Sequence, residues 1–487
     1  MSKPLHKEPS LLDAVIPVGF LVTLLFGSVY LYGADSSYGA NQIALIFSGG
    51  VALLIGWKNG HRWIDIEEAI AGGIAKTFGA MLILLTVGAL IGSWILAGIV
   101  PAMIYYGLQF INPDIFYFTA CLLCALTAIS IGSSWSAAGT VGIGLMGVSA
   151  GLGLSLEITA GAIISGAYFG DKMSPLSDTT NLAPAIAGGD LFSHIRHMAW
   201  TTIPAITLAL ILYAILGFTA DVDVTTINLN ERLAQIDQAF NIGPHLMIPL
   251  VVVLALAIKG YPPFPTLFFG ALLGAVFALL FQQDTILTFV NNAEAGEVRN
   301  LIDGVWRSLF GGYQSSTGNA EVDALLSRGG MASMLNTIWL IICAIVFGSI
   351  MEHLGLLKRL VVGLIGLAKT QGSLILLTAC TCIGVNIIAA DQYISIVLPG
   401  RMYRIEFRNR GLASKNLSRV LEDAGTVTSV LIPWNTCGAF MAGTLGVATF
   451  DYAMFCFFNL ASPFFSVLYG YLNFKITPVE AEEAAPA

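Results

Sequence analysis

Long runs of apolar residues alternate with short polar segments along most of the chain. An α-helix needs about 20 residues to cross the roughly 30 Å hydrocarbon layer of a membrane, and many of the runs approach that length. Several runs are short or interrupted, so we expect about 11 to 13 transmembrane helices together with broken or re-entrant pieces. The runs lie near residues 11–32, 41–57, 77–100, 115–133, 158–170, 198–218, 246–258, 263–281, 333–351, 372–390, 425–447 and 452–473.

The composition agrees with an all-α polytopic membrane protein. Hydrophobic residues fill 56% of the 487 positions and charged residues only 11%, whereas a soluble domain carries about 25% charged residues. The formal net charge of −8 argues against a basic surface for nucleic acid. The apolar runs are continuous, unlike the alternating ten-residue segments of a membrane β-barrel. The partner that this composition implies is a lipid bilayer.

The basic residues predict how the chain is oriented in the membrane. If the amino terminus is cytoplasmic, residues 57–62 and 401–419 also lie inside. About 17 of the 22 Lys and Arg then face the cytoplasm, as the positive-inside rule requires. The two long outer loops, near 219–245 and 282–332, are acidic on balance. Both termini are therefore expected to be cytoplasmic.

An internal repeat is visible at low identity. The stretch from about Met81 to Met146 resembles the stretch from about Met334 to Pro399, at an offset of 256 to 259 residues. On the predicted topology the two copies cross the membrane in opposite directions, which is the construction of many secondary transporters. We therefore divide the chain into N-terminal helices with a cytoplasmic linker (1–76), a first inverted repeat (77–197), connecting helices and outer loops (198–332), a second inverted repeat (333–475) and a cytoplasmic tail (476–487).

Polar and helix-breaking residues interrupt the apolar sequence twice in each repeat. The densest segment is 171–184, where Pro175 ends any helix that runs through it. An unpaired charge at bilayer depth costs about 2.5–3.5 kcal/mol on insertion scales, so we expect Lys172 to pair locally with Asp171 or Asp178. Composition alone also allows a polar loop at the membrane surface. The candidate ion- or substrate-binding residues are Lys172, Ser174, Ser177, Thr179, Thr180, Asn181, Ser134, Ser136, Asn386, Thr426, Thr428, Ser429, Trp434 and Asn435.

The run from Gly166 to Pro184, GAYFGDKMSPLSDTTNLAP, closely resembles the signature of the NhaC-type Na⁺/H⁺ antiporter family. The length, the number of apolar runs and the basic stretch near 401–419 agree with that family over essentially the whole chain. The resemblance implies exchange of Na⁺ for H⁺ across a bacterial-type inner membrane. It also implies a second reading, because some family members exchange malate and lactate or carry amino acids.

A membrane-embedded carboxylate can couple two cation fluxes, since its charged form attracts Na⁺ and its protonated form does not. Burial raises a carboxyl pKa by up to about 3–5 units, which brings it toward neutral pH. We assign this role to Asp178, with a Na⁺ site at Asp178, Thr179 and Asn181, and a structural or gating role to Asp171 with Lys172. The reverse assignment stays open. By repeat symmetry, Asp391 and Asp423 are expected to approach the same site.

The alternative function is Na⁺- or H⁺-coupled transport of small organic anions, such as malate or lactate, or of amino acids. A carboxylate cargo would then meet Lys172, Trp135, Trp434 and Asn435. We expect no enzyme, since the sequence contains no H-E-x-x-H motif. No cofactor is expected, and Na⁺ and H⁺ are the transported ions. His194 and His197 are expected on the solvated surface. Glu422 is expected either on that surface or at the site. The oligomeric state, including a homodimer, stays open.

Overall fold

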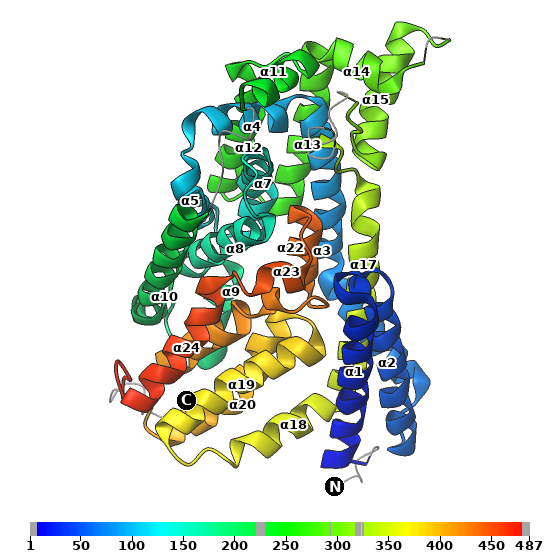
Figure 1. Cartoon of the computed structure of the whole chain (residues 1–487). Helices are drawn as coiled ribbons and strands as arrows, with labels where there is room; N and C mark the ends of the chain where they lie inside the picture. Colours follow the sequence, from blue (N-terminus) through cyan, green and yellow to red (C-terminus); the bar gives the residue numbers. More distant parts are fainter. Residues whose placement is uncertain (1–6, 221–228, 293, 317–322, 324–325, 480–487) are drawn as a thin grey trace.

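The computed structural model describes residues 7–220, 229–292, 294–316, 323 and 326–479. Parts of the predicted outer loops, and most of the predicted tail, lie outside these ranges. Within these ranges every regular secondary-structure element is a helix. The only β-type pairing there is a single antiparallel bridge between Leu412 and Pro478. The start of α1 and the end of α24 lie toward the same end of the molecule, opposite α14 and α15 (Figure 1).

The first part of the chain forms long apolar helices with well-defined ends. Helix α1 begins at a capping box, in which Ser10 accepts from the backbone of Asp13 while the Asp13 carboxylate accepts from the backbone of Ser10. The next helices end at short turns. The bounds are α1 (Leu11–Tyr32), α2 (Ala40–Lys58), α3 (Trp63–Leu96), α4 (Ile99–Phe110), α5 (Phe116–Ile131), α6 (Ser134–Ala137), a π-helical turn η3 (Ala138–Gly142), α7 (Ile143–Gly151), α8 (Leu156–Met173) and α9 (Asp178–Ala187).

The middle of the chain connects two groups of broken helices. Helix α10 begins at Asp190, whose side chain accepts from the backbone of Ser193. Its bounds and those of the following helices are α10 (Leu191–Thr219), α11 (Leu229–Ala239), α12 (Ile248–Ile258), α13 (Pro263–Phe281), α14 (Gln283–Val290) and α15 (Glu297–Gly311).

The last part contains the second group of broken helices. Its most irregular stretch follows α21, where a π-helical turn leads into a short 3₁₀ turn and then into α22. The bounds are η5 (Met331–Met334), α17 (Leu335–His353), α18 (Leu356–Ile365), α19 (Gln371–Ala389), α20 (Gln392–Asn409), α21 (Ser414–Val420), η6 (Leu421–Thr426), η7 (Ser429–Leu431), α22 (Thr436–Leu445), α23 (Thr449–Ala453) and α24 (Phe457–Leu472).

Eight helices of the described chain are long and apolar enough to span a membrane. The bent pair formed by residues 233–239 and 244–258 would make a ninth span. The expected run at 425–447 is not one helix, because Pro433 and the Asn435 cap divide it before α22. Helices α4, α7, α18 and α20 were not among the expected spans. The eight are α1, α2, α3, α5 (with the preceding turn), α10, α13, α17 (with η5) and α19.

Glycines allow two of the closest helix contacts. A Cβ at Gly166 of α8 would lie 2.0 Å from the Cys121 carbonyl oxygen of α5, and one at Gly170 would lie 2.3 Å from the Ala125 carbonyl oxygen. Small residues permit such close backbone approach between membrane helices. The two contacts advance together along both helices, so α5 and α8 run parallel, and the α6–α7 segment connects the end of α5 to the start of α8.

Helices α3 and α17 occupy matching places in the expected repeats and pack against each other in antiparallel fashion. Gly88 of α3 lies against Met334 at the start of the α17 span, whereas Gly73 lies against Ser349 near its end. The corresponding helices therefore run in opposite directions within the molecule.

The breaks in the two groups share one backbone pattern. First, a helix ends at a residue in the left-handed conformation, and an extended N-cap residue follows it. Further along, a proline precedes a second N-cap residue, and the short helix after that cap ends at a left-handed glycine. Equivalent positions differ by 258 residues throughout, within the offset expected from sequence. The pairs are Gly132 and Ala390, Ser133 and Asp391, Pro175 and Pro433, Ser177 and Asn435, and Gly188 and Gly446.

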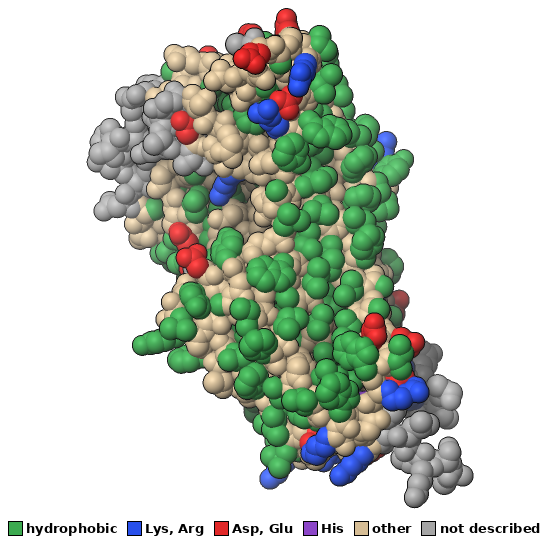
Figure 2. Space-filling model, turned by 90° about the vertical axis from the view of Figure 1, so that its right-hand side faces the viewer, with side chains coloured by type: hydrophobic (Ala, Val, Ile, Leu, Met, Phe, Trp, Pro, Cys, Tyr) green, Lys and Arg blue, Asp and Glu red, His purple; other side chains and the backbone are tan. Residues whose placement is uncertain are grey.

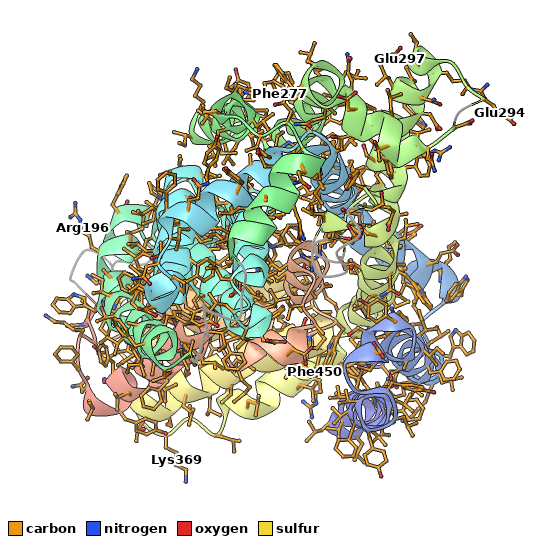
Figure 3. The ribbon with its side chains drawn as sticks, turned by 45° about the horizontal axis from the view of Figure 1, so that its top comes forward. Arg196, Phe277, Glu294, Glu297, Lys369 and Phe450 are labelled. Carbon is orange, nitrogen blue, oxygen red and sulfur yellow. The ribbon has the colours of Figure 1, made fainter. Side chains whose placement is uncertain are left out.

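The outer surface separates apolar and charged side chains. Hydrophobic side chains cover the middle of the face in Figure 2, and most charged side chains visible there lie toward its two ends. Figure 3 places Glu294 and Glu297 at the end opposite Lys369, and the exposed Arg196 side chain points away from the ribbon. This distribution matches an apolar belt for lipid between two polar ends.

Candidate ion site at the helix breaks

The carboxylate of Asp171 lies at the break after α8 and is 7% exposed. Its Oδ2 accepts two hydrogen bonds from Ser134 of α6, one from the backbone N–H at 3.1 Å and one from the hydroxyl at 2.7 Å. Its Oδ1 has no hydrogen-bond partner in the described part of the chain. The Thr180 hydroxyl donates to the backbone carbonyls of Asp171 and Lys172, at 3.3 and 3.0 Å. Hydroxyl, carbonyl and carboxylate oxygens therefore converge at this break.

Lys172 is fully buried and forms an ion pair with Asp423 of η6, which is also fully buried. The Thr201 hydroxyl of α10 donates to the same carboxylate oxygen at 3.2 Å. The expected local pairing of Lys172 with Asp171 or Asp178 is therefore wrong. Successive residues of a helix point about 100° apart, so Lys172 faces η6 while Asp171 faces α6. The ion pair joins the two groups of broken helices directly.

Three buried carboxylates share this region with two buried cations. Glu422 is fully buried, and neither of its carboxylate oxygens has a hydrogen-bond partner among the described residues. It lies within electrostatic range of Lys172 and Asp171, and Arg419 lies within range of Asp423. Arg419 is buried and donates to the Lys475 carbonyl at 3.0 Å.

The charges in this cluster do not balance. If all are ionised, Asp171, Glu422 and Asp423 carry −3 against +2 on Lys172 and Arg419. Buried charge is costly unless it is paired. The cluster thus carries one net negative charge, and Asp171, Glu422 and Asp423 each have at least one oxygen without a hydrogen-bond partner among the described residues. No three acidic, His or Cys side chains of the described chain lie close enough together to hold one metal ion.

Asp178 is placed differently from the expectation of a desolvated carboxylate. It is the first residue of α9 and is exposed, since the loop of Pro175 and Leu176 before it lies on the rim of the molecule. Its Oδ1 accepts from the Thr179 backbone at 2.8 Å, and its Oδ2 accepts from the Tyr393 hydroxyl. Asp178 therefore bridges the first break to the first turn of α20, at the edge of the buried cluster.

The other two members of the expected Na⁺ set are engaged locally. The exposed Asn181 amide donates to the carbonyls of Pro175 and Ser177, at 2.8 and 2.6 Å. The buried Thr179 hydroxyl lies 3.2 Å from the Ser177 hydroxyl. Ser174 donates to the Ile129 carbonyl at 2.8 Å. These contacts fix the loop between α8 and α9.

The expected residues of the second group hold its break together. Asn386 donates to the Gly425 carbonyl at 2.6 Å and to Thr428 Oγ1 at 3.2 Å, and its Oδ1 accepts from Asn435 at 3.1 Å. The Trp434 indole donates to the Ile387 carbonyl at 2.7 Å. The remaining residues are buried. In the second group Asp391 caps α20, Ser429 donates to the Thr426 carbonyl, and the Thr426 hydroxyl has no partner among the described residues. In the first group Ser136 lies in α6.

The structure adds residues that sequence reasoning did not place at the site. Thr201 lies in an apolar run and Arg419 in the basic stretch, so neither position carried a signal of its own. Tyr393 reaches Asp178 from 215 residues away. His194 and His197 are buried, contrary to the expected surface position, and His194 Nδ1 lies 2.8 Å from the Ser418 hydroxyl. Glu422 belongs to the buried cluster and not to the surface.

Comparison with known proteins agrees with this arrangement. The sequence profile of the Na⁺/H⁺ antiporter family matches residues 166–474, a range that contains the signature segment and the whole buried cluster. The chain belongs to the Na⁺/H⁺ antiporter family. It is a multi-pass membrane protein of a family of secondary transporters, as the signature segment indicated.

Three relatives show how varied the cargo of similar chains is. The Na⁺/H⁺ antiporter NhaC of Alkalihalophilus pseudofirmus is 35% identical, over 97% of this chain and 98% of its own length. The malate-2H⁺/Na⁺-lactate antiporter of Bacillus subtilis is 35% identical over 95% of both chains. The arginine/ornithine antiporter ArcD of Halobacterium salinarum is 36% identical, over 98% of this chain and 95% of its own. Similarity over the full length therefore shows an antiporter family without fixing one cargo.

Proposed function

We propose that this protein exchanges Na⁺ for H⁺, and that the two ions compete for the buried carboxylate of Asp171. The observation that carries the proposal is the charge imbalance of the buried cluster, in which three carboxylates face two cations at the helix breaks. One added Na⁺ or one added proton brings the cluster to neutrality. Both cannot occupy the same carboxylate, so binding of one ion releases the other.

The oxygens around Asp171 suit a small hard cation. An alkali ion must receive replacements for the waters that it loses, and hydroxyl, carbonyl and carboxylate oxygens are the ligands that such ions accept. Ser134 supplies a hydroxyl to the carboxylate, Thr180 supplies one at the backbone carbonyl of Asp171, and Oδ1 of Asp171 is unpartnered in the described part of the chain. Na⁺ would displace the hydrogen bond from Ser134 and take that hydroxyl as a ligand.

Asp171 suits this role better than Asp178, which the sequence favoured. A coupling carboxylate needs a pKa near the working pH, and desolvation is what raises a carboxyl pKa from near 4. Asp178 is exposed and held by Tyr393, so we assign it to guiding ions at the rim of the site. Lys172 and Asp423 form the structural pair that joins the two halves.

We also propose that the two groups of broken helices are inverted repeats that alternate access to the site. The constant spacing of 258 residues between equivalent breaks and the antiparallel packing of α3 on α17 support this. In such transporters the site lies near the midplane where the repeats meet. Glu294 and Glu297 lie at the end opposite Lys369 (Figure 3), which supports a topology with cytoplasmic termini; we place the protein in a bacterial-type inner membrane.

Uptake of ²²Na⁺ into proteoliposomes tests the proposal. An acidic interior should drive Na⁺ inward against its gradient, and Asp171→Asn should abolish this uptake while Asp178→Asn keeps a measurable part of it. Asn has nearly the same shape as Asp but can neither hold a negative charge nor release a proton. Uptake that ignores the pH gradient, or full gradient-driven uptake by Asp171→Asn, would overturn the proposal.

A second candidate function is coupled transport of a small organic anion, which the name of the Bacillus subtilis malate-2H⁺/Na⁺-lactate antiporter states for that protein. Lys172, expected as part of a cargo surface, is fully buried and paired with Asp423. A carboxylate cargo would therefore need another cation. A separate cavity supplies one.

A further inference from the structure

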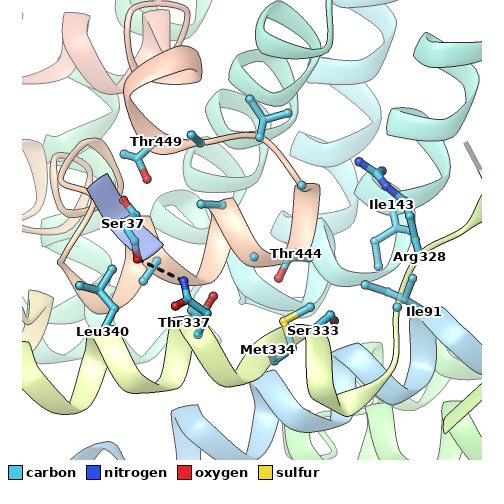
Figure 4. Close-up of a pocket in the computed structure, with 18 of the residues that line it drawn as sticks. Ser37, Ile91, Ile143, Arg328, Ser333, Met334, Thr337, Leu340, Thr444 and Thr449 are labelled. Carbon is cyan, nitrogen blue, oxygen red and sulfur yellow. Dashed lines mark hydrogen bonds between the residues drawn. The ribbon is translucent and has the colours of Figure 1, made fainter. Parts of the chain in front are cut away.

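A cavity of about 300 Å³ lies between the start of the α17 span, α22 and α7, separate from the buried charge cluster (Figure 4). This is at the small end of the volumes typical of ligand pockets. Pro433, at the break before α22, lines it. On the predicted topology Arg328 belongs to the outer loop, so the cavity lies on the outer side of the second break.

Arg328 supplies the only charged side chain among the lining residues that the structure describes. Burial lowers the pKa of its guanidinium, the direction expected for a cation withdrawn from water without a compensating anion. Among the described residues no carboxylate pairs with it and no carbonyl or hydroxyl accepts from its side chain. Arginine stays charged in proteins, so the cavity carries a full positive charge for which the described residues supply no counter-ion.

The wall of the cavity is divided by polarity. Ile91, Ile143 and Met334 contribute apolar surface, whereas Ser333, Thr337 and Thr444 contribute hydroxyls (Figure 4). The Asn336 side chain is held in place by a hydrogen bond to the Ser37 carbonyl at 3.1 Å. A ligand that fits must combine a negative charge, a short carbon chain and hydrogen-bonding groups.

We propose that this cavity binds a small carboxylate with a short carbon chain, and that Arg328 holds its carboxylate group. The planar guanidinium matches the two oxygens of a carboxylate in a bidentate arrangement. The apolar wall takes the carbon chain, and the hydroxyls take polar substituents such as an α-hydroxyl. The proposal rests on the proposed transport function, since it names the chemical class of an organic cargo beside the coupling cation.

The equivalent position in the first group provides a matched control. A Cβ at Gly446 would lie 2.5 Å from an Arg328 guanidinium nitrogen, and a Cβ at Gly188, 258 residues earlier, would lie 2.3 Å from one of Arg404. Both arginines thus lie against the glycine that ends a short helix, where a cation meets unpaired carbonyls favourably. Arg404 is exposed and does not line the cavity. A purely structural role at the helix end would affect both arginines alike.

Ligand binding to the purified full-length protein in detergent tests the proposal. Thermal stabilisation and calorimetric titration are measured with sodium L-lactate and sodium L-malate. Equal concentrations of sodium chloride control for Na⁺ and for inorganic anions, and lactamide controls for the uncharged isostere. We expect saturable binding of lactate or malate, no binding of lactamide, at least about tenfold weaker binding for Arg328→Gln, partial recovery for Arg328→Lys and unchanged binding for Arg404→Gln.

Several results would overturn the proposal. These are no binding of lactate or malate beyond sodium chloride, equal binding of lactamide, wild-type affinity in Arg328→Gln, or equal loss in Arg404→Gln. Because this measurement uses no gradient, it is independent of ²²Na⁺ uptake. Exchange without carboxylate binding would refute only the cavity, and carboxylate binding without Na⁺/H⁺ exchange would refute only the proposed exchange.

Discussion

The buried pair of Lys172 and Asp423 should show strong energetic coupling. Removing one partner of a buried ion pair costs about 3–5 kcal/mol, because the other charge is left uncompensated. Both side chains are 0% exposed. After Lys172→Met, Asp423 keeps one hydrogen bond from Thr201, so we place this variant near the lower end, at about 3 kcal/mol. Asp423→Leu leaves a buried ammonium and should cost about 3–5 kcal/mol.

The double variant should recover most of that loss. With both charges removed, neither member of the pair is left buried without its partner, and similar replacements are often neutral or stabilising. If the two single losses simply added, the double variant would lose their sum in free energy of unfolding. We expect the free energy of unfolding of Lys172→Met with Asp423→Leu to be at least about 3 kcal/mol higher than that additive value. Reversible unfolding by SDS in mixed micelles, followed by tryptophan fluorescence, measures all four corners of this double-mutant cycle.

An exposed pair serves as the control for this cycle. Arg62 and Asp65 form an ion pair with side chains 72% and 27% exposed, so Arg62→Gln should cost no more than about 1 kcal/mol. The reasoning is refuted if Lys172→Met is no more destabilising than Arg62→Gln, or if the two single losses simply add in the double variant.

Two further changes test the helix packing and the rim of the site. Gly166→Val should prevent folding, because a Cβ there would lie 2.0 Å from the Cys121 carbonyl oxygen. The control Gly19→Val has open space around it and should yield normal amounts of monodisperse protein by fluorescence size-exclusion chromatography. Equal yields of the two variants would contradict the α5–α8 contact. Tyr393→Phe removes the hydrogen bond to exposed Asp178. It should change the free energy of unfolding by no more than about 1 kcal/mol and lower the rate of ²²Na⁺ uptake. Unfolding of the variant, or an unchanged uptake rate, would show that Tyr393 has another role.

Much of the helical framework could be predicted from the hydrophobic pattern. The bounds expected for 11–32 and 263–281 coincide with α1 and α13, since both are uninterrupted apolar runs. Helix α3 begins 14 residues earlier than expected, at Trp63 and not at 77. Its first turns carry charged residues, which remove the apolar signal without stopping the helix. Helix α20 was missed for a similar reason, because its basic second half does not resemble a span.

The site was only partly predictable. Residue types located the breaks, because prolines, hydroxyls and charges within apolar sequence have few structural alternatives. The pairing of Lys172 with Asp423 joins positions 251 residues apart, and the burial of Asp171 beside the exposure of Asp178 depends on how α8 ends and α9 begins. Such facts come from tertiary packing, which local sequence does not encode. The 258-residue spacing of the breaks was visible in sequence only as a weak similarity.

The central claim is that Na⁺ and H⁺ compete for one buried carboxylate. The most direct test is the apparent Na⁺ affinity of wild-type exchange in proteoliposomes, measured over a series of pH values. Competition with one proton predicts that the apparent Na⁺ affinity falls about tenfold for each pH unit below the carboxyl pKa while the maximal rate stays constant. An apparent Na⁺ affinity that does not change with pH would contradict the claim.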